Sequence, residues 1–241
     1  MHIANIEYTV DGTHMLGHLA TDDSRHDTRP GVLVCHEGPG MSDHTKNIAN
    51  RLGALGYVTF ALDYHGGGTM LARDQMMSKL GGLMGDHARI ARLGQSGLDI
   101  LLAQEHVDPT RIAAIGYCFG GTMALEMGRS GAALNAIVGF HSGLGTKHPE
   151  DAQNITGTVL VNIGADDPMI PAEQRQAFEQ EMRAGGVDWR MNLYGGAQHS
   201  FTNPAAAESG MPGVVYNESA DRRSWAAMLS VFDECFNSSD Q

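Results

Sequence analysis

The sequence predicts an α/β fold, in which a mostly parallel sheet has helices on both faces. Short apolar runs rich in β-branched residues, typical of buried strands, alternate along the chain with longer segments of helical periodicity. Polar residues that could carry chemistry follow directly after several of these runs. Because the carboxyl ends of parallel strands meet at one edge of a sheet, a site is expected there.

The chain has 241 residues, which is enough for one large α/β domain with a substantial core. Hydrophobic residues make up 42% and charged residues 18%, as is usual for a globular protein. The sequence contains no internal repeat and no low-complexity linker. We therefore expect a single domain over residues 1–241.

Charge and cysteine content exclude several classes of protein. Lysine and arginine total 16 against 28 acidic residues, a net charge of −12, which argues against nucleic acid or an anionic membrane as partner. The three cysteines (Cys35, Cys118 and Cys235) lie far apart, so a disulfide framework or a cysteine zinc site is not expected. With no signal-peptide pattern and no membrane-spanning apolar stretch, we expect a cytoplasmic protein.

The first half of the chain begins with a predicted hairpin. Residues 3–10 alternate in polarity, Asp11-Gly12 favours a tight turn, and residues 14–20 resume the extended pattern. This pair would lie at one edge of the sheet. The further elements expected are a strand over 31–35, a helix over 44–55 capped by Ser42 or Asp43, a strand over 57–62 and a helix over 85–104.

A methionine-rich stretch follows the strand at 57–62. Met70, Met77 and Met84 recur at heptad spacing, which is more typical of core packing than of a ligand site. The stretch is also flanked by glycines and follows the carboxyl end of a strand. The alternative interpretation is therefore a cover over a substrate site.

The second half of the chain alternates strands and helices. The expected elements are strands over 111–115, 134–140, 158–163 and 187–194, and helices over 122–127, 171–184 and 219–236. Pro171 occupies an early helical position, where proline is tolerated. This alternation predicts parallel strand pairing.

Residues 116–121 have the pattern of a nucleophile elbow, in which a strand turns sharply into a helix at the nucleophile. The nucleophile would be Cys118, with glycines on both sides to permit the tight corner. The start of the helix favours a thiolate at this position. The alternative is a buried cysteine in a glycine-rich turn.

Four polar residues each follow a predicted strand: Glu37, Cys118, Asp167 and His199. The order nucleophile, acid, histidine is that of the α/β-hydrolase triad. In that scheme His199 accepts the thiol proton, and Asp167 holds the imidazole and stabilises its charged form. Asp166 is the alternative acid, and Glu37 could be a surface carboxylate.

A metal site is not expected. His36, His65 and His141 lie in loops, but no H-E-x-x-H or comparable ligand spacing is present.

These segments resemble the dienelactone hydrolase family, carboxymethylenebutenolidase-like enzymes of the α/β-hydrolase superfamily. The matching pieces are His36-Glu37 and residues 116–121, 164–171 and 195–201. The resemblance implies ring-opening hydrolysis of an enol lactone, without a cofactor, by a triad of Cys118, Asp167 and His199. It further implies that Glu37 assists deprotonation of the thiol, and that the amides of Phe119 and Gly38 form the oxyanion hole.

The chain departs from the family at the substrate. Relatives that cleave dienelactone carry an arginine four residues after the histidine, where this chain has Asn203. The segment after residue 62 also lacks the arginine common in relatives, and Arg73, Lys79 or Arg89 could compensate for it. The candidate substrate contacts are Tyr64, His65, Asn203 and Arg73. Since a buried carboxylate without a partner is costly, neutral lactones or esters fit at least as well as dienelactone.

The sequence thus predicts a hydrolase of small ester or lactone substrates, as a monomer or small homo-oligomer. A broad carboxylesterase or thioesterase on the same triad is the alternative enzyme. A redox-responsive protein oxidised at Cys118 is the non-enzymatic alternative, and no resolving cysteine lies near it in sequence.

Overall fold

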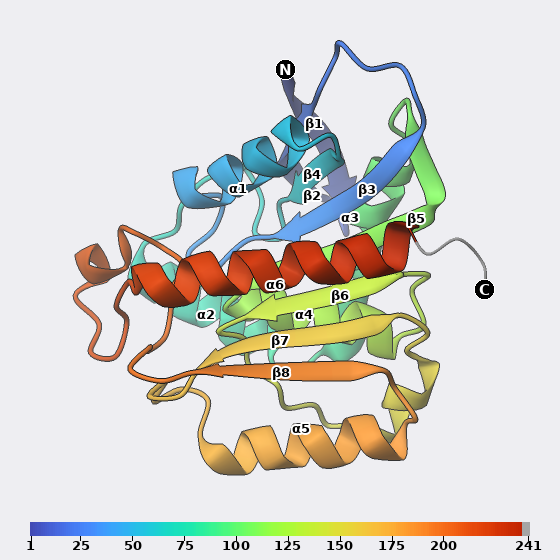
Figure 1. Cartoon of the computed structure of the whole chain (residues 1–241). Coiled ribbons are helices and arrows are strands. Elements are labelled where there is room, and N and C mark those ends of the chain that lie inside the picture. The colour runs from blue at the N-terminus through green and yellow to red at the C-terminus, as the bar shows by residue number, and fades with distance from the viewer. Residues whose placement is uncertain (238–241) are drawn as a thin grey trace. The chain divides into compact units, whose positions relative to one another are not determined.

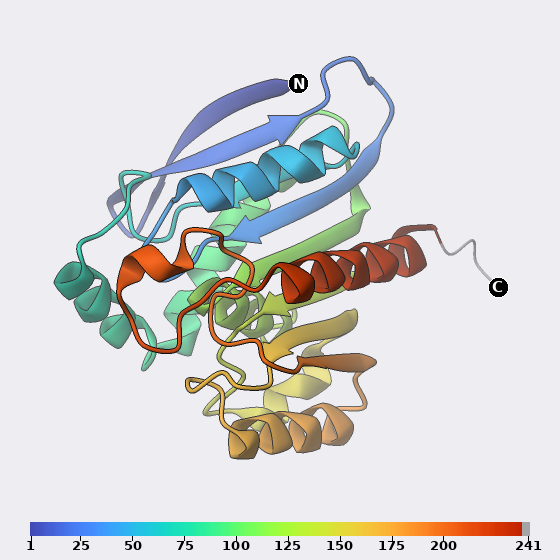
Figure 2. The ribbon, with the colours of Figure 1, turned by 60° about the vertical axis from the view of Figure 1, so that its left-hand side comes forward.

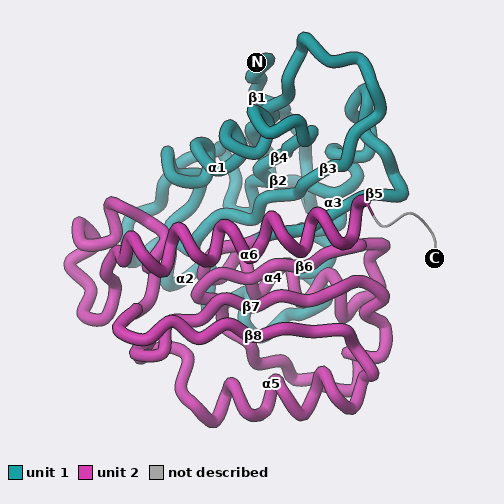
Figure 3. Tube along the Cα trace, in the orientation of Figure 1, with its two compact units in different colours: residues 1–115 teal, residues 116–241 magenta. Residues whose placement is uncertain are grey.

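The computed structural model describes residues 1–237, and the chain divides into two compact units (Figure 3). The first unit comprises residues 1–115 and the second begins at Gly116. The boundary falls within strand β5 (Val107–Tyr117), just before the predicted elbow. The expectation of a single domain stays a prediction.

The first unit is built on a mixed sheet with the strand order β1-β2-β4-β3-β5. Its other strands are β1 (His2–Val10), β2 (Thr13–Thr21), β3 (Arg29–Cys35) and β4 (Val58–Leu62). The β1–β2 and β2–β4 pairs are antiparallel, whereas β3 and β4 are parallel. The predicted hairpin is confirmed: Asp11 and Gly12 both have positive φ (49° and 75°), as a two-residue hairpin turn requires.

Three helices belong to the first unit: α1 (Asp43–Ala54), α2 (Arg73–Leu83) and α3 (His87–Leu102). The hydroxyl of Ser42 caps α1 by accepting a hydrogen bond from the N–H of Thr45. Helix α1 packs on β2, β3 and β4, and α3 packs on β3 and β4. Figures 1 and 2 show these two helices on opposite faces of the strands, as an α/β fold requires.

The prediction that Met70, Met77 and Met84 pack in the core is wrong. Their exposed fractions are 53%, 59% and 64%. Helix α2 buries Met76 and Leu83, which share the same spacing of seven but lie one position earlier. A shift of one residue rotates the buried face by about 100° around the helix axis. The predicted spacing of seven is therefore correct, but the residues predicted to face the core are not.

The second unit contains the parallel strands β6 (Ala136–Phe140), β7 (Thr158–Gly164) and β8 (Trp189–Tyr194) in that order. Its helices are α4 (Phe119–Arg129), α5 (Ala172–Ala184) and α6 (Glu218–Asn237), with short 3₁₀ helices η1 (Pro149–Asn154) and η2 (Ala206–Ser209), which the sequence did not predict. Helix α4 packs on β6, and α6 packs on β6 and β7. Figure 1 shows α4 behind these strands and α6 in front. The predicted α/β class is confirmed.

No helix within residues 1–237 combines the length and hydropathy needed to cross a bilayer.

A buried ionic cluster joins α4 to α5. The guanidinium of Arg129 donates to Glu181 at 2.7 and 2.9 Å, to Glu126 at 2.7 Å and to the carbonyl of Leu144 at 2.9 Å. All three charged side chains are nearly inaccessible, and burial raises the pKa of Glu181 even though Arg129 opposes this. Removing the single cation would leave two carboxylates buried together.

Replacing Arg129 with methionine is therefore expected to lower the free energy of unfolding by about 3–5 kcal/mol. Urea unfolding measures this change. The matched control is Arg183→Met on α5, because Arg183 pairs with Glu179 on an exposed surface, where ion pairs contribute little. Equal effects of the two substitutions would show that the buried cluster does not stabilise the unit as described.

Candidate active site

Cys118 occupies a sharp corner between β5, which ends at Tyr117, and α4, which begins at Phe119. Its backbone has φ 53° and ψ −122°, a region that non-glycine residues rarely adopt. Such strain at the N-cap of a helix is the geometry of a nucleophile elbow. Cys118 is partly exposed, and it lies at the positive end of the α4 dipole.

The corner depends on close backbone packing at Gly116. A Cβ atom there would lie 2.1 Å from both the carbonyl carbon and the carbonyl oxygen of Gly120. Because these are backbone atoms, they cannot move aside as a flexible side chain would. The small residues of the motif are thus required by the turn itself.

Asp167 and His199 are in direct contact. The Nδ1 atom of His199 donates to Oδ2 of Asp167 at 2.8 Å, and Oδ1 of Asp167 accepts from the N–H of Met169 at 2.8 Å. Both residues are buried. The neighbouring Asp166 is exposed, so of the two candidate carboxylates only Asp167 holds the histidine.

Electrostatics favour the charged form of His199. Burial by itself would lower its pKa, but the hydrogen bond to the Asp167 carboxylate and the proximity of the Cys118 sulfur raise the pKa to about 10. Within the described residues Nε2 has no well-aligned hydrogen-bond partner, although the sulfur of Cys118 is close enough to act on it. His199 can therefore hold a proton at neutral pH and present it through Nε2.

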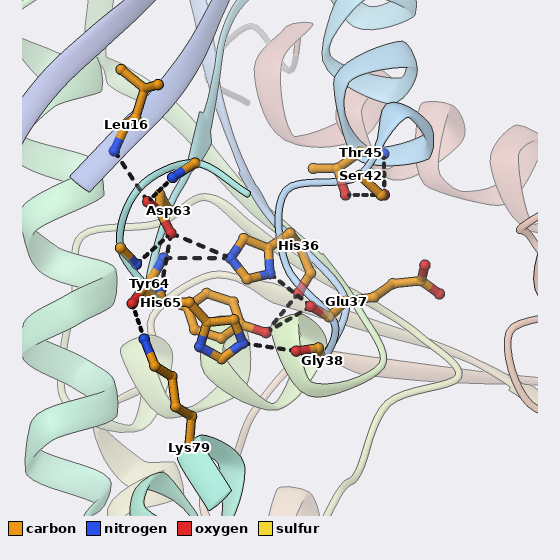
Figure 4. A network of polar contacts seen from close by, with 12 residues as sticks. Leu16, His36, Glu37, Gly38, Ser42, Thr45, Asp63, Tyr64, His65 and Lys79 are labelled. Carbon is orange, nitrogen blue, oxygen red and sulfur yellow. Dashed lines mark hydrogen bonds and ion pairs between the residues drawn. The ribbon is translucent and has the colours of Figure 1, made fainter. Parts of the chain in front are cut away.

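Glu37 and Gly38 lie in the first unit, in the loop after β3 (Figure 4). The carbonyl of Glu37 accepts three hydrogen bonds: from Nδ1 of His36 at 2.7 Å, the hydroxyl of Tyr64 at 3.0 Å and the N–H of Gly40 at 3.1 Å. In a trans peptide the C=O and the following N–H point in opposite directions. Fixing the Glu37 carbonyl therefore also fixes the N–H of Gly38.

The same loop is held by residues after β4, organised by Asp63. Its buried carboxylate accepts the N–H groups of Leu16, His65, Gly66 and Gly68 at 2.7–3.1 Å. Burial would raise the pKa of Asp63, but the nearby imidazole of His36, 3.9 Å away, and the backbone N–H donors lower it strongly. The aspartate thus stays charged and stabilises the turn that positions Tyr64 and His65.

Of the four candidate substrate contacts, Tyr64 and His65 have polar groups engaged by the protein. The hydroxyl of Tyr64 donates to the Glu37 carbonyl, and Nε2 of His65 donates to the Gly38 carbonyl at 2.7 Å. Burial lowers the pKa of His65 to about 4. Asn203 accepts the N–H of Ala205, and Arg73 is exposed at the start of α2. Their contact with substrate stays a prediction. The carboxylate of Glu37 is directed away from the His36 and Tyr64 rings (Figure 4).

Sequence reasoning missed two contributors. Asp63 follows β4, and His141 follows β6 with its Nδ1 atom 3.2 Å from the backbone nitrogen of Cys118. Both follow the end of a strand, so the criterion that singled out His199 would have marked them as candidates but would not have given their contacts. Among residues 1–237, no three histidine, cysteine or acidic side chains gather as a metal site.

The sheet and its flanking helices form the α/β-hydrolase fold, and the family match makes the chain a hydrolase of the dienelactone hydrolase type. The chain belongs to the dienelactone hydrolase family, whose model matches residues 15–236. It is 41% identical to a dienelactone hydrolase-like promiscuous phosphotriesterase, P91, from metagenomic libraries (97% and 98% of the chains covered, TM-score 0.94). It is 46% identical to a solved structure called m3DLH (98% of each chain, TM-score 0.94). A putative carboxymethylenebutenolidase of Salmonella typhimurium is 26% identical, with 92% of this chain and 83% of that protein covered.

The contact between Asp167 and His199 predicts how His199 titrates. In the wild-type protein its pKa lies well above 6.5, and Asp167→Asn should bring it down, because burial then acts with less opposition. NMR titration of nitrogen-15-labelled histidine measures both values. Asp166→Asn is the matched control and should leave the titration unchanged. A wild-type midpoint at or below 6.5 would contradict this description.

Proposed function

We propose that this hydrolase cleaves small neutral esters or lactones through a triad of Cys118, Asp167 and His199. The observation that carries the proposal is the buried hydrogen bond between Asp167 and His199, with the imidazole next to a cysteine at a strained helix start. A histidine held by a carboxylate and adjoining a nucleophile is the arrangement that nucleophilic catalysis needs.

The first half of the reaction forms a thioester. Once the proton of the Cys118 thiol has passed to His199, the thiolate attacks the substrate carbonyl carbon. The tetrahedral intermediate collapses with loss of the alkoxide, and His199 transfers its proton from Nε2 to that oxygen. Acyl-Cys118 and neutral His199 remain, and in a lactone the released alcohol stays attached to the acyl group.

The second half regenerates the enzyme. Neutral His199 takes a proton from water, and the hydroxide attacks the thioester carbonyl. Collapse releases the carboxylic acid and the Cys118 thiolate, and His199 is again protonated beside Asp167. Asp167 keeps its charge throughout, stabilising the imidazolium and holding the proton on Nδ1.

The family resemblance adds two further roles to the proposal: stabilisation of the oxyanion and assistance in deprotonating the thiol. The amides of Phe119 and Gly38 would stabilise the oxyanion, and Glu37 would assist deprotonation of the thiol. The fixed peptide between Glu37 and Gly38 supports this role, since oxyanion stabilisation depends on donors oriented in advance. Asn203 in place of an arginine supports an uncharged substrate.

Cys118→Ala is expected to lower kcat/KM for 4-nitrophenyl acetate and for a simple enol lactone by at least about 1,000-fold, because the covalent step is lost. Cys235→Ala is the matched control: Cys235 is also a free, partly exposed cysteine and should be dispensable. Full esterase activity in Cys118→Ala would end the proposal.

A second candidate activity is phosphotriester hydrolysis, favoured by the 41% identity to the promiscuous phosphotriesterase P91. The same groups could perform it. The Cys118 thiolate would displace an aryl oxide from phosphorus, and His199 would protonate the departing oxide. Water deprotonated by His199 would then release the phosphodiester and restore the thiolate.

Diethyl 4-nitrophenyl phosphate tests this second activity by release of nitrophenol. We expect slower turnover than with 4-nitrophenyl acetate, and loss of both activities in Cys118→Ala, because one nucleophile serves both. Phosphotriester turnover that survives Cys118→Ala while ester turnover is lost would contradict a shared site. An acyl thioester assayed alongside distinguishes a thioesterase from an esterase.

A further inference from the structure

His141 lies directly after β6, and its ring is completely buried. The Nδ1 atom is 3.2 Å from the backbone nitrogen of Cys118, and the Nε2 atom is 2.8 Å from Oγ1 of Thr202. The centroid of the ring is 5.2 Å from that of His199. One side chain therefore contacts the turn that carries the cysteine and the loop that carries the histidine.

The donor and acceptor roles at His141 follow from its partners. The N–H of Cys118 can only donate, so Nδ1 accepts and carries the lone pair. The ring proton is then on Nε2, which donates to the hydroxyl of Thr202. The N–H of Cys118 is also 3.0 Å from the carbonyl of Phe140, so residues 140 and 141 both accept from it.

The surroundings of His141 fix the ring in this orientation. Its backbone is in the left-handed region, with φ 42°, and its N–H donates to the carbonyl of Asn162 on β7 at 2.8 Å. The ring packs edge-on against Phe201, at 5.3 Å between centroids. A buried side chain with both nitrogens engaged and an aromatic neighbour has little freedom to rotate.

We propose that His141 is a positioning residue that holds the strained backbone of Cys118 in place relative to His199. This inference rests on the proposed triad. The hydrogen bond from the Cys118 N–H favours the conformation with φ 53°, which the chain would otherwise avoid. Thr202 follows His199 by three residues, so the same imidazole restrains both reacting groups from one side.

Two substitutions separate the two contacts. In His141→Asn the amide oxygen can take the position of Nδ1 and accept the Cys118 N–H, while the contact with Thr202 is lost. In His141→Gln the side chain reaches toward Thr202 but places no acceptor at the position of Nδ1, so the Cys118 N–H keeps only the carbonyl of Phe140. Asparagine also tolerates positive φ, so Thr202→Val and Thr202→Ser are needed as a second pair that does not alter this backbone.

The readouts are kcat and KM for 4-nitrophenyl acetate and the alkylation rate of Cys118 with iodoacetamide. His141→Gln should lower kcat about 10- to 100-fold with KM nearly unchanged, because the reacting atoms are displaced without loss of substrate contacts. The alkylation rate should fall with kcat. His141→Asn keeps an acceptor for the Cys118 N–H and loses only the contact with Thr202, so its kcat should fall about 3- to 10-fold, less than that of His141→Gln.

Thr202→Val and Thr202→Ser test the contact between His141 and Thr202, and they can be measured even if His141→Gln does not fold. Thr202→Val removes the hydroxyl and should lower kcat about 3- to 10-fold, and Thr202→Ser should restore it. Wild-type kcat and alkylation in His141→Gln would overturn the inference, as would equal losses in His141→Asn and His141→Gln. If neither His141→Gln nor His141→Asn folds, equal kcat values in Thr202→Val and Thr202→Ser would overturn the inference.

Failure of the triad itself is distinguishable. If Cys118→Ala hydrolyses esters normally, the proposed function is wrong whatever His141 does. The alkylation rate needs no turnover, so a slower rate in His141→Gln would still support positioning of Cys118. Conversely, an inactive Cys118→Ala with an unaffected His141→Gln would leave the triad standing and remove only the role of His141.

Discussion

The hydrogen bond between Asp167 and His199 is the interaction on which the proposed chemistry of this protein depends. A buried imidazole would ordinarily be neutral, because taking its charged form out of water is costly. The adjacent carboxylate and the nearby thiol reverse that preference and keep a proton on the ring. In the proposed mechanism this proton is available to a leaving group, and the sulfur of Cys118 acts as the nucleophile.

The strand register of the second unit makes this contact possible. Strands β7 and β8 are parallel, and Gly164 pairs with Tyr194 at their carboxyl ends. Beyond that pair, backbone hydrogen bonds from Ala165 to Tyr194 and from Asp166 to Ala197 join the two loops. A Cβ atom on Gly164 would lie 2.4 Å from the carbonyl oxygen of Ala197, so glycine permits the close approach. Asp167 and His199 then follow on adjoining loops.

The sequence was a good guide wherever one local rule decided the structure. Alternating polarity and Asp11-Gly12 predicted the hairpin, and the strand–glycine–helix pattern predicted the corner at Cys118. Helix α2 shows the limit of such rules, because the buried positions Met76 and Leu83 are set by what the helix packs against. Spacing alone cannot show which residues of the helix face the core.

Other features depend on residues far apart in the chain and leave no local pattern. Arg129 and Glu181 are 52 residues apart, yet they form a buried pair. The pairing of Asp167 with His199 was predicted only as part of a triad order, in which Asp167 was preferred to Asp166, and the structure shows Asp167 in contact with His199. His141 was considered only as a metal ligand, since nothing in the sequence shows that its ring meets the backbone of Cys118.

The most direct measurement is mass spectrometry of the enzyme quenched during turnover of a slowly hydrolysed 4-nitrophenyl ester. A thiolate activated by the pair of Asp167 and His199 must carry the acyl group between the two halves of the reaction. The proposed mechanism predicts an acyl adduct on the peptide that contains Cys118, and none in Cys118→Ala. An adduct on another residue, or steady turnover with Cys118 never modified, would contradict it.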